Sequence, residues 1–192
     1  VLVGLLFVIL FIAKNTLVKN DINNTNDAQD AFLEPPFDFN QAQEEQQSLA
    51  KTLGLAVETT VDLGRGVNLA MILIPQGKFI MGSPLSEPGH KDDELQHQVV
   101  FSRPYFIGKY EVTQEQWEAV MGDNPSQTKG AKLPVTNISW NDCQNFISKL
   151  NAKTESNYRF PTEAEWEFAC RSGAKSAYSV GDKITKNDAN YE

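Results

Sequence analysis

From residue 57 onward the chain contains five short apolar runs with the length and composition of β-strands. β-Branched and aromatic residues dominate these runs, and glycine, proline or charged residues separate them, which is the pattern of strands joined by turns and loops. The tripeptide GRG at Gly64–Gly66 predicts a turn after the first run, and Pro75–Gly77 a turn after the second. The predicted strands cover residues 57–63, 71–74, 78–82, 97–102 and 105–110.

Three later segments have the period of amphipathic helices, and each begins with a capping box. The boxes pair Thr113 with Gln116, Ser139 with Asp142 and Thr162 with Glu165. Gly122 and Gly173 predict the ends of the first and third helices. The apolar faces are predicted to hold Trp117, Val120 and Met121, then Trp140, Cys143, Phe146, Ile147 and Leu150, and finally Trp166, Ala169 and Cys170. We expect the three tryptophans to share one interior.

The third helix also carries charged residues that are spaced four apart. Glu163, Glu167 and Arg171 share one face. Two carboxylates one turn apart are a pattern that can supply an acid and a base. Because an arginine lies on the same face, we interpret these residues as a structural salt-bridge network.

The strands and helices follow one another in mixed order with long turn-rich loops, which predicts an α+β fold rather than alternating βαβ units. The globular pattern begins at residue 70, so we expect residues 70–192 to form the domain, preceded by a transitional segment over residues 48–69. Residues 15–47 are rich in Asn, Asp, Gln and Glu and predict an acidic, disordered linker.

Residues 1–14 begin with the apolar run VLVGLLFVILFIA, which Lys14 stops. A helix that crosses a bilayer needs about 20 apolar residues, so the run is short for a span. The chain begins with Val1 rather than Met and ends after a loop-like segment, which indicates a piece of a longer protein. We therefore interpret the run as the remnant of a membrane anchor or of a signal peptide. Membrane association through Val1–Ala13 is favoured over a buried helix, because no polar face is present.

Charge and cysteine content narrow the classes of function. The net charge of −8 falls mostly in the linker, and no basic stripe is present, so the chain has no electrostatic footprint for nucleic acid. The two cysteines, Cys143 and Cys170, are too few for a disulfide scaffold and lack the close pairing of a zinc site. Each lies on the apolar side of a predicted helix and is interpreted as a small buried hydrophobe. A disulfide between them is the alternative in an oxidising compartment.

Five segments resemble, in the same order, successive segments of the formylglycine-generating enzyme family, also called the sulfatase-modifying factor domain. The most specific of them is YRFPTEAEWEFACRSG at Tyr158–Gly173. The others are MILIPQGKFIMGSP at Met71–Pro84, YEVTQEQWEAVMGDNPS at Tyr110–Ser126, LPVTNISWNDC at Leu133–Cys143 and GDKITKNDANYE at Gly181–Glu192. The joint match identifies the domain as the N-terminal part of a member of this family.

This resemblance implies a C-type-lectin-like fold and a particular reaction. Members of the family use molecular oxygen to oxidise one cysteine of a sulfatase precursor to formylglycine. The resemblance also implies copper(I), held by two closely spaced cysteines near the end of the domain. Those positions lie beyond Glu192, so we expect no catalytic residue in this chain. Cys170 matches a structural cysteine of some members, whereas Cys143 departs from the family pattern.

Calcium is the second metal that the resemblance implies. In the family an Asn side chain and the carbonyl oxygen of the next residue bind calcium, and ANY at Ala189–Tyr191 matches that step. Asn190 and Tyr191 are therefore the predicted ligands, with further oxygen donors beyond this chain. Another loop combines two histidines with three acids but lacks the spacing of known metal motifs, and it is interpreted as solvated. Its residues are His90, Asp92, Asp93, Glu94 and His97.

We therefore expect the complete protein to be a membrane-anchored, extracytoplasmic enzyme, on the periplasmic or secreted side, that acts on sulfatase precursors. The alternative is a non-catalytic relative that uses the same scaffold as a membrane-tethered binding or sensory module. Relatives that synthesise sulfoxides with iron rank last, because no His-bearing helical domain is visible in the sequence. Two nearby cysteines in the closing segment of the complete domain would favour the oxidase over the binding module.

Overall fold

The computed structural model describes residues 13–15, 33–87, 89–174, 176–179, 181 and 183–188. Its strands are β1 Ala13–Asn15, β2 Glu58–Asp62, β3 Asn68–Ile74, β4 Gly77–Met81, β5 His97–Phe101, β6 Tyr105–Gly108 and β7 Tyr158–Arg159. Five of them form an antiparallel sheet in the order β2-β3-β6-β1-β7. The other two, β4 and β5, form a separate antiparallel ribbon. All five strands predicted from the sequence are present, and the α+β class is confirmed.

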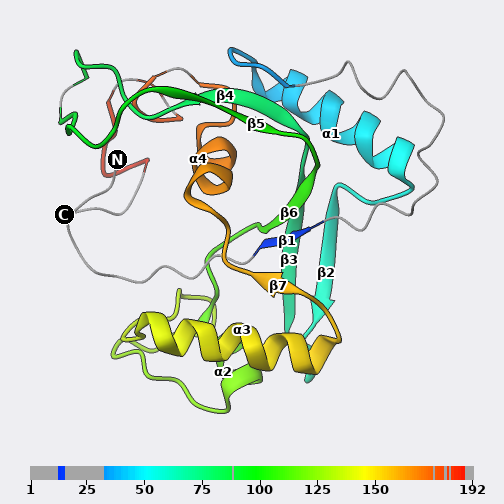
Figure 1. Cartoon of the computed structure of the whole chain (residues 1–192). Helices are drawn as coiled ribbons and strands as arrows, with labels where there is room; N and C mark the ends of the chain where they lie inside the picture. The colour runs from blue at the N-terminus through cyan, green and yellow to red at the C-terminus, as the bar shows by residue number, and fades with distance from the viewer. Residues whose placement is uncertain are drawn as a thin grey trace.

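The helices are α1 Phe39–Leu53, α2 Gln114–Met121, α3 Trp140–Thr154 and α4 Glu163–Arg171. Each of the three predicted capping boxes is present, at the starts of α2, α3 and α4. Gly122 ends α2 in the left-handed conformation, as predicted. In Figure 1, α4 lies beneath the β4–β5 ribbon, whereas α2 and α3 lie together at the opposite end of the sheet.

Helix α1 begins within the segment that was expected to be a disordered linker, so that expectation is wrong for residues 39–47. Asp38 and Gln41 form a capping box at its start, and Gly54 ends it in the left-handed conformation. Ala50 is buried, and the Gln46 side chain donates a hydrogen bond to the carbonyl oxygen of Leu73 at 2.9 Å. The Gln- and Glu-rich composition that indicated disorder also suits a helix, and packing beside β3 decides between the two. The folded part therefore includes helix and strand within residues 39–69, where a linker and a transitional segment were expected.

Strand β1 is an inner strand of the five-stranded sheet, between β6 and the edge strand β7. Lys14 stands opposite Phe106 on one side and Tyr158 on the other. Ala13 and Lys14 are the end of the run predicted as an anchor. Residues 1–12 lie outside the described residues, so the anchor stays a prediction. No helix in the described ranges is both long enough and apolar enough to cross a membrane.

The main hydrophobic core lies between the five-stranded sheet and helices α2 and α3. Trp117 stacks on Phe146 with ring centroids 5.1 Å apart, and both rings are buried. The predicted inner face of α3 is confirmed for Cys143, Phe146, Ile147 and Leu150. Trp140 is an exception, because it is 53% exposed and stacks on Phe160 at 4.0 Å. This tryptophan opens the first turn of α3, where it covers the surface instead of entering the core.

A second, smaller core joins α4 to the ribbon. Phe168 lies 5.4 Å from Phe79 and 5.2 Å from Phe101 between ring centroids. The predicted inner face of α4 is therefore wrong: Glu165 and Phe168 are buried, Trp166 is 38% exposed and Cys170 is exposed. The helix is turned this way because its first turn is fixed by a buried ion pair. The expectation that the three tryptophans share one interior is wrong, because Trp117 is buried in the main core whereas Trp140 and Trp166 are exposed.

Candidate functional site

The sequence run Tyr158–Gly173 forms β7, a turn and α4, and its most buried charge is Glu165. The residue is 8% exposed. Arg159 donates to both carboxylate oxygens, from Nη2 to Oε1 at 2.6 Å and from Nη1 to Oε2 at 2.7 Å. The backbone N–H of Thr162 donates to Oε2 at 2.8 Å. Two-pronged pairs of this kind are among the strongest hydrogen-bonded contacts in proteins. The pair fixes the start of α4 against β7.

Tyr105 connects this pair to the sheet, since its hydroxyl donates to the backbone oxygen of Glu165 at 2.6 Å. Burial raises the pKa of Tyr105 far above its usual range, and the charge of Glu165 adds to the rise. Burial also acts to raise the pKa of Glu165, but hydrogen bonds from Arg159 and Thr162 outweigh it and hold the pKa below 4.5. At neutral pH the tyrosine keeps its proton and the glutamate has none. At this pH the group is a neutral phenol hydrogen-bonded beside a closed ion pair, which holds the first turn of α4 against the sheet.

The roles of Arg159 and Tyr105 were not predicted from the sequence. For Arg159 a signal was present, because an arginine stands six residues before a capping-box glutamate, with Pro161 making the turn between them. Such a turn brings the two side chains back together. For Tyr105 no local signal exists, since it is 60 residues away from its partner along the chain.

Glu167 and Arg171 form the ion pair expected from their spacing. The Arg171 Nε lies 2.7 Å from Glu167 Oε1. The same carboxylate oxygen accepts from the backbone N–H of Gly82 at 3.2 Å, and Arg171 Nη2 donates to the Gly82 oxygen at 3.1 Å. The end of β4 is thereby tied to α4. Glu163 is exposed and takes no part in this contact, so the two carboxylates do not form an acid and base pair.

A groove of about 310 Å³ lies between β4 and the C-terminal end of α4. Phe79 and Phe168 contribute apolar wall, and Lys78 and Arg171 contribute charged side chains. Both cations are already paired, Lys78 with Glu34 at 2.8 Å and Arg171 with Glu167. The groove is a recess that could bind a ligand, and its two cations are already paired with carboxylates.

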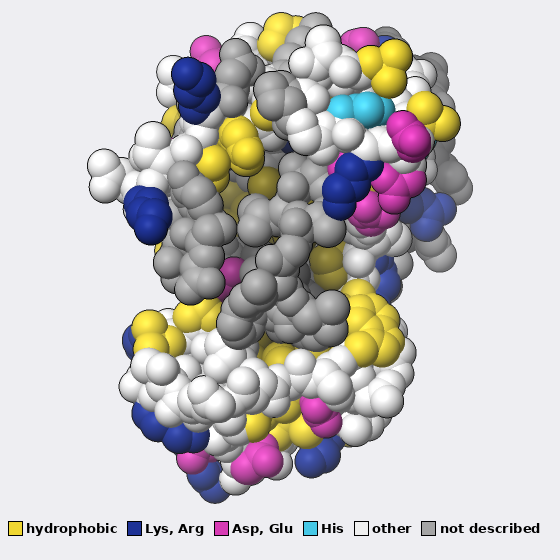
Figure 2. Space-filling model, turned by 90° about the vertical axis from the view of Figure 1, so that its left-hand side faces the viewer, with side chains coloured by type: hydrophobic (Ala, Val, Ile, Leu, Met, Phe, Trp, Pro, Cys, Tyr) yellow, Lys and Arg dark blue, Asp and Glu magenta, His cyan; other side chains and the backbone are white. Residues whose placement is uncertain are grey.

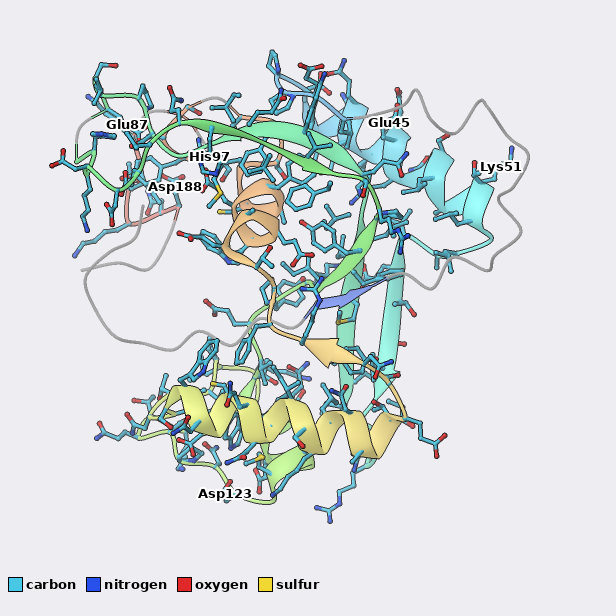
Figure 3. All side chains as sticks on the ribbon, viewed as in Figure 1. Glu45, Lys51, Glu87, His97, Asp123 and Asp188 are labelled. Carbon is cyan, nitrogen blue, oxygen red and sulfur yellow. The ribbon has the colours of Figure 1, made fainter. Side chains whose placement is uncertain are left out.

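The loop between β4 and β5 contains a polar cluster around Ser83. The Ser83 hydroxyl donates to Glu94 Oε2 at 2.7 Å and accepts from His90 Nδ1 at 2.6 Å. His97 stands apart, with Nδ1 2.9 Å from the oxygen of Leu95. Figure 3 labels Glu87 in this loop and His97 at the start of β5. Figure 2 shows acidic and basic side chains mixed near a histidine on the upper part of one face.

The two cysteines lie in different environments. Cys143 is fully buried in the main core, and burial together with the charge of Asp142 raises its pKa to about 11. Cys170 is exposed as a residue, although partial desolvation raises the pKa of its thiol. Both are free thiols on separate helices. No group of three or more His, Cys, Asp or Glu side chains suited to a metal occurs within the described ranges.

These thiols do not fit a copper site. Copper(I) prefers thiolates that share the ion, and one of these thiols is enclosed in a hydrophobic core while the other stands on a different helix. The predicted calcium ligands Asn190 and Tyr191 lie outside the described residues. Their role stays a prediction.

The domain has an α+β fold. Ion pairs within the segment Tyr158–Gly173 connect α4 to the five-stranded sheet and to the β4–β5 ribbon. A family model for the sulfatase-modifying factor enzyme 1-like domain matches residues 62–192. The chain therefore belongs to this family, and the resemblance noted from the sequence is confirmed.

Individual relatives share between a fifth and two fifths of their residues with the chain where they align. The chaperone protein LppX of Paenibacillus barcinonensis is 34% identical over 38% of this chain and 38% of its own length. The formylglycine-generating enzyme of Thermomonospora curvata is 39% identical over 36% of this chain and 21% of its own length. The inactive C-alpha-formylglycine-generating enzyme 2 of Bos taurus is 23% identical over 74% of this chain and 62% of its own length. The chain thus spans less than two thirds of each relative.

Two solved structures share the fold. The structure of PvdO from Pseudomonas aeruginosa is similar with a TM-score of 0.53 and 28% identity, over 60% of this chain and 52% of that protein. The Treponema denticola variable protein 1 is similar with a TM-score of 0.55 and 27% identity, over 65% of this chain and 60% of that protein.

Proposed function

We propose that the complete protein is a formylglycine-generating enzyme, which uses molecular oxygen to oxidise a cysteine in a sulfatase precursor to formylglycine. The observation that supports this most directly is the family match over residues 62–192. The Thermomonospora relative, which bears the name of that activity, adds to the support. In this proposal the complete domain has a C-type-lectin-like fold, and the described residues form its scaffold.

The copper that such an enzyme uses would supply the redox chemistry. Because Cys143 and Cys170 do not fit a copper site, the proposal takes the copper thiolates from the part of the relatives' length that this chain does not cover. The contribution of this chain is then structural. The helix α4 is held in place by Arg159, Glu165 and Tyr105. A groove lies beside this helix.

The proposed reaction can be tested directly on the full-length protein. It would be incubated with copper, a reductant and air, together with a peptide that contains a CxPxR sequence. We expect mass spectrometry to detect conversion of the peptide thiol to an aldehyde. A peptide with serine in place of that cysteine is the matched control and should stay unchanged. Absence of conversion in the cysteine peptide would count against the oxidase.

The second candidate is a non-catalytic binding or sensory module. It is favoured by the Bos taurus relative, whose name describes an inactive protein and which aligns over most of this chain. In this case the copper-loaded full-length protein would leave the CxPxR peptide unchanged while still binding a partner. The presence or absence of two nearby cysteines in the closing segment of the complete domain gives an independent distinction.

Calcium at Asn190 and Tyr191 belongs to the same proposal. Calcium takes six to eight oxygen ligands, so the site would need donors from a larger part of the protein. We expect a chelator to lower the melting temperature of the full-length protein, and Asn190→Ala to remove the effect. An equal response of the variant and the parent protein to the chelator would contradict the assignment.

We also propose that the protein is anchored in a membrane through Val1–Ala13 and that its domain lies outside the cytoplasm. The apolar composition of this run supports the proposal. Protease added to intact cells should then digest the domain, whereas a cytoplasmic marker protein in the same cells should survive. A domain that survives with the marker would disprove this location.

A further inference from the structure

Among the described residues, hydrogen bonds cover the outer edge of β4 at both ends but not in the middle. At one end the N–H of Lys78 donates to the oxygen of Leu33 at 2.9 Å. At the other end the N–H of Gly82 donates to Glu167 at 3.2 Å. Because backbone groups alternate in direction along a strand, the N–H and C=O of Ile80 face the same outer side. No hydrogen bond reaches them there from the part of the chain that the structure describes.

The cause of this opening lies in the sequence of the neighbouring segment. Leu33 pairs with Gly77 in parallel fashion, and its N–H donates to the oxygen of Gln76 at 3.3 Å. The next residue that would face β4 is Pro35, which has no N–H to donate to Lys78. Pairing therefore stops at Leu33. Within the described ranges, no strand pairs with the C=O of Lys78 or with either backbone group of Ile80.

The groove described above lies along this open stretch. Its lining includes Lys78 and Ile80 from β4, and Phe168 and Arg171 from α4. From Lys78 to Gly82 a strand rises by about 13 Å, at roughly 3.3 Å per residue, which gives room for three or four residues of another strand. A volume of about 310 Å³ is at the lower end of the range for ligand pockets.

We propose that this groove binds an extended segment of a partner polypeptide, which adds to β4 as a third strand. The alternating donor and acceptor groups of Lys78 and Ile80 match an extended backbone. The chain's own Leu33 already binds the same edge in this way. Because Lys78 and Arg171 are both paired with carboxylates, the groove favours a neutral extended backbone over a free anion. This inference does not depend on the proposed oxidation.

Hydrogen exchange of the Ile80 amide tests the proposal on the unsubstituted chain. The probe is an acetylated and amidated Thr-Val-Thr-Val-Thr peptide, which favours an extended conformation. We expect the Ile80 amide to exchange rapidly in the free protein. At saturating peptide its exchange should slow by about tenfold or more. An Ile80 amide that is already protected without peptide, or that remains unprotected with it, overturns the proposal.

Two proline variants give a matched comparison. Ile80 and Val100 are both exposed on the ribbon, at 49% and 53%, but they face opposite edges. Val100 stands opposite Lys78, so its N–H faces the outer edge of β5. Ile80→Pro should abolish peptide binding, whereas Val100→Pro should preserve it. The reverse result would place the peptide on β5 and refute the proposal.

Two controls separate binding from other effects. Far-UV circular dichroism and thermal melting check that both variants fold, and if Ile80→Pro does not fold, the exchange measurement on the unsubstituted protein decides. Sedimentation equilibrium without peptide tests whether a second copy of the chain takes the edge instead. A dimer that protects the Ile80 amide would contradict the assignment of a partner polypeptide.

Discussion

Glu165 is the residue on which the start of α4 depends most. It is nearly buried and accepts from Arg159 and Thr162. We expect Glu165→Gln to reduce the free energy of unfolding by about 2 kcal/mol, because Arg159 loses its carboxylate partner in a partly buried place. Urea unfolding followed by circular dichroism measures the change. Glu163→Gln, on the exposed side of the same helix, is the control and should change stability by less than about 0.5 kcal/mol.

The same carboxylate predicts a dependence of stability on pH. The pKa of Glu165 is lower in the folded protein than its ordinary value of 4.5. The unfolded chain therefore binds the proton first as the pH falls, and the stabilisation is present above pH 4.5 and is lost as the pH passes through the folded pKa. Urea unfolding between about pH 3 and pH 6 should show a smaller loss of stability toward acid in Glu165→Gln than in the parent protein. Parallel curves would contradict this.

The two thiols should react at different rates. Cys143 has no exposed surface and a pKa of about 11, whereas Cys170 is exposed. With iodoacetamide at mildly alkaline pH we expect Cys170 to be modified on the order of 100-fold faster, because Cys143 reacts only when the core opens. Peptide mapping by mass spectrometry assigns each site. Cys170→Ser should leave a native protein without a rapidly reacting thiol.

At the level of single residues, sequence patterns predicted caps better than burial. The capping boxes at Thr113, Ser139 and Thr162 depend on contacts three residues apart, so local sequence contains the whole signal. The exposure of Trp166 and Cys170 could not be predicted in this way. It follows from the rotation of α4, which the distant Tyr105 and the Arg159–Glu165 pair determine together.

Helix α1 is the element whose place in the fold was least evident from composition. Ala50→Asp should place a charge in its buried contact and reduce the free energy of unfolding by about 2 to 3 kcal/mol. Thermal and urea unfolding would measure the loss. Gln47→Asp introduces the same group on the exposed side of α1 and is expected to have little effect. Equal, small effects of both substitutions would show that α1 is not part of the cooperative fold.

The strands were predictable as elements but not in their pairing. Residues 71–74 and 78–82 read as neighbours separated by a turn, yet β3 pairs with β2 and β6 while β4 pairs with β5. Local sequence does not show which strands pair, because pairing depends on contacts between distant parts of the chain. Likewise, the groove arises from Pro35, β4 and α4 together. No single segment indicated it.

At the scale of the molecule, two separate cores suggest two levels of stability. Phe168→Ala should weaken the smaller core around Leu33 and Phe79. We expect amides of β4, β5 and α4 to lose protection from hydrogen exchange, while those of α3 keep most of theirs. Phe146→Ala, in the main core, should lower protection throughout. Uniform loss in Phe168→Ala would indicate one cooperative unit instead.

Leu33 has a practical consequence, because it lies well before Asp62, where the family match begins. An added Cβ on Gly77 would stand 2.6 Å from both the Leu33 oxygen and the Phe168 ring, so the three segments meet in one tight place. A shortened chain that starts at Asp62 would leave the β4 edge bare beside Phe79. Bare edges next to aromatic surface promote aggregation. We therefore expect a well-behaved domain to require the chain from Leu33 onward, and not only the recognised family sequence.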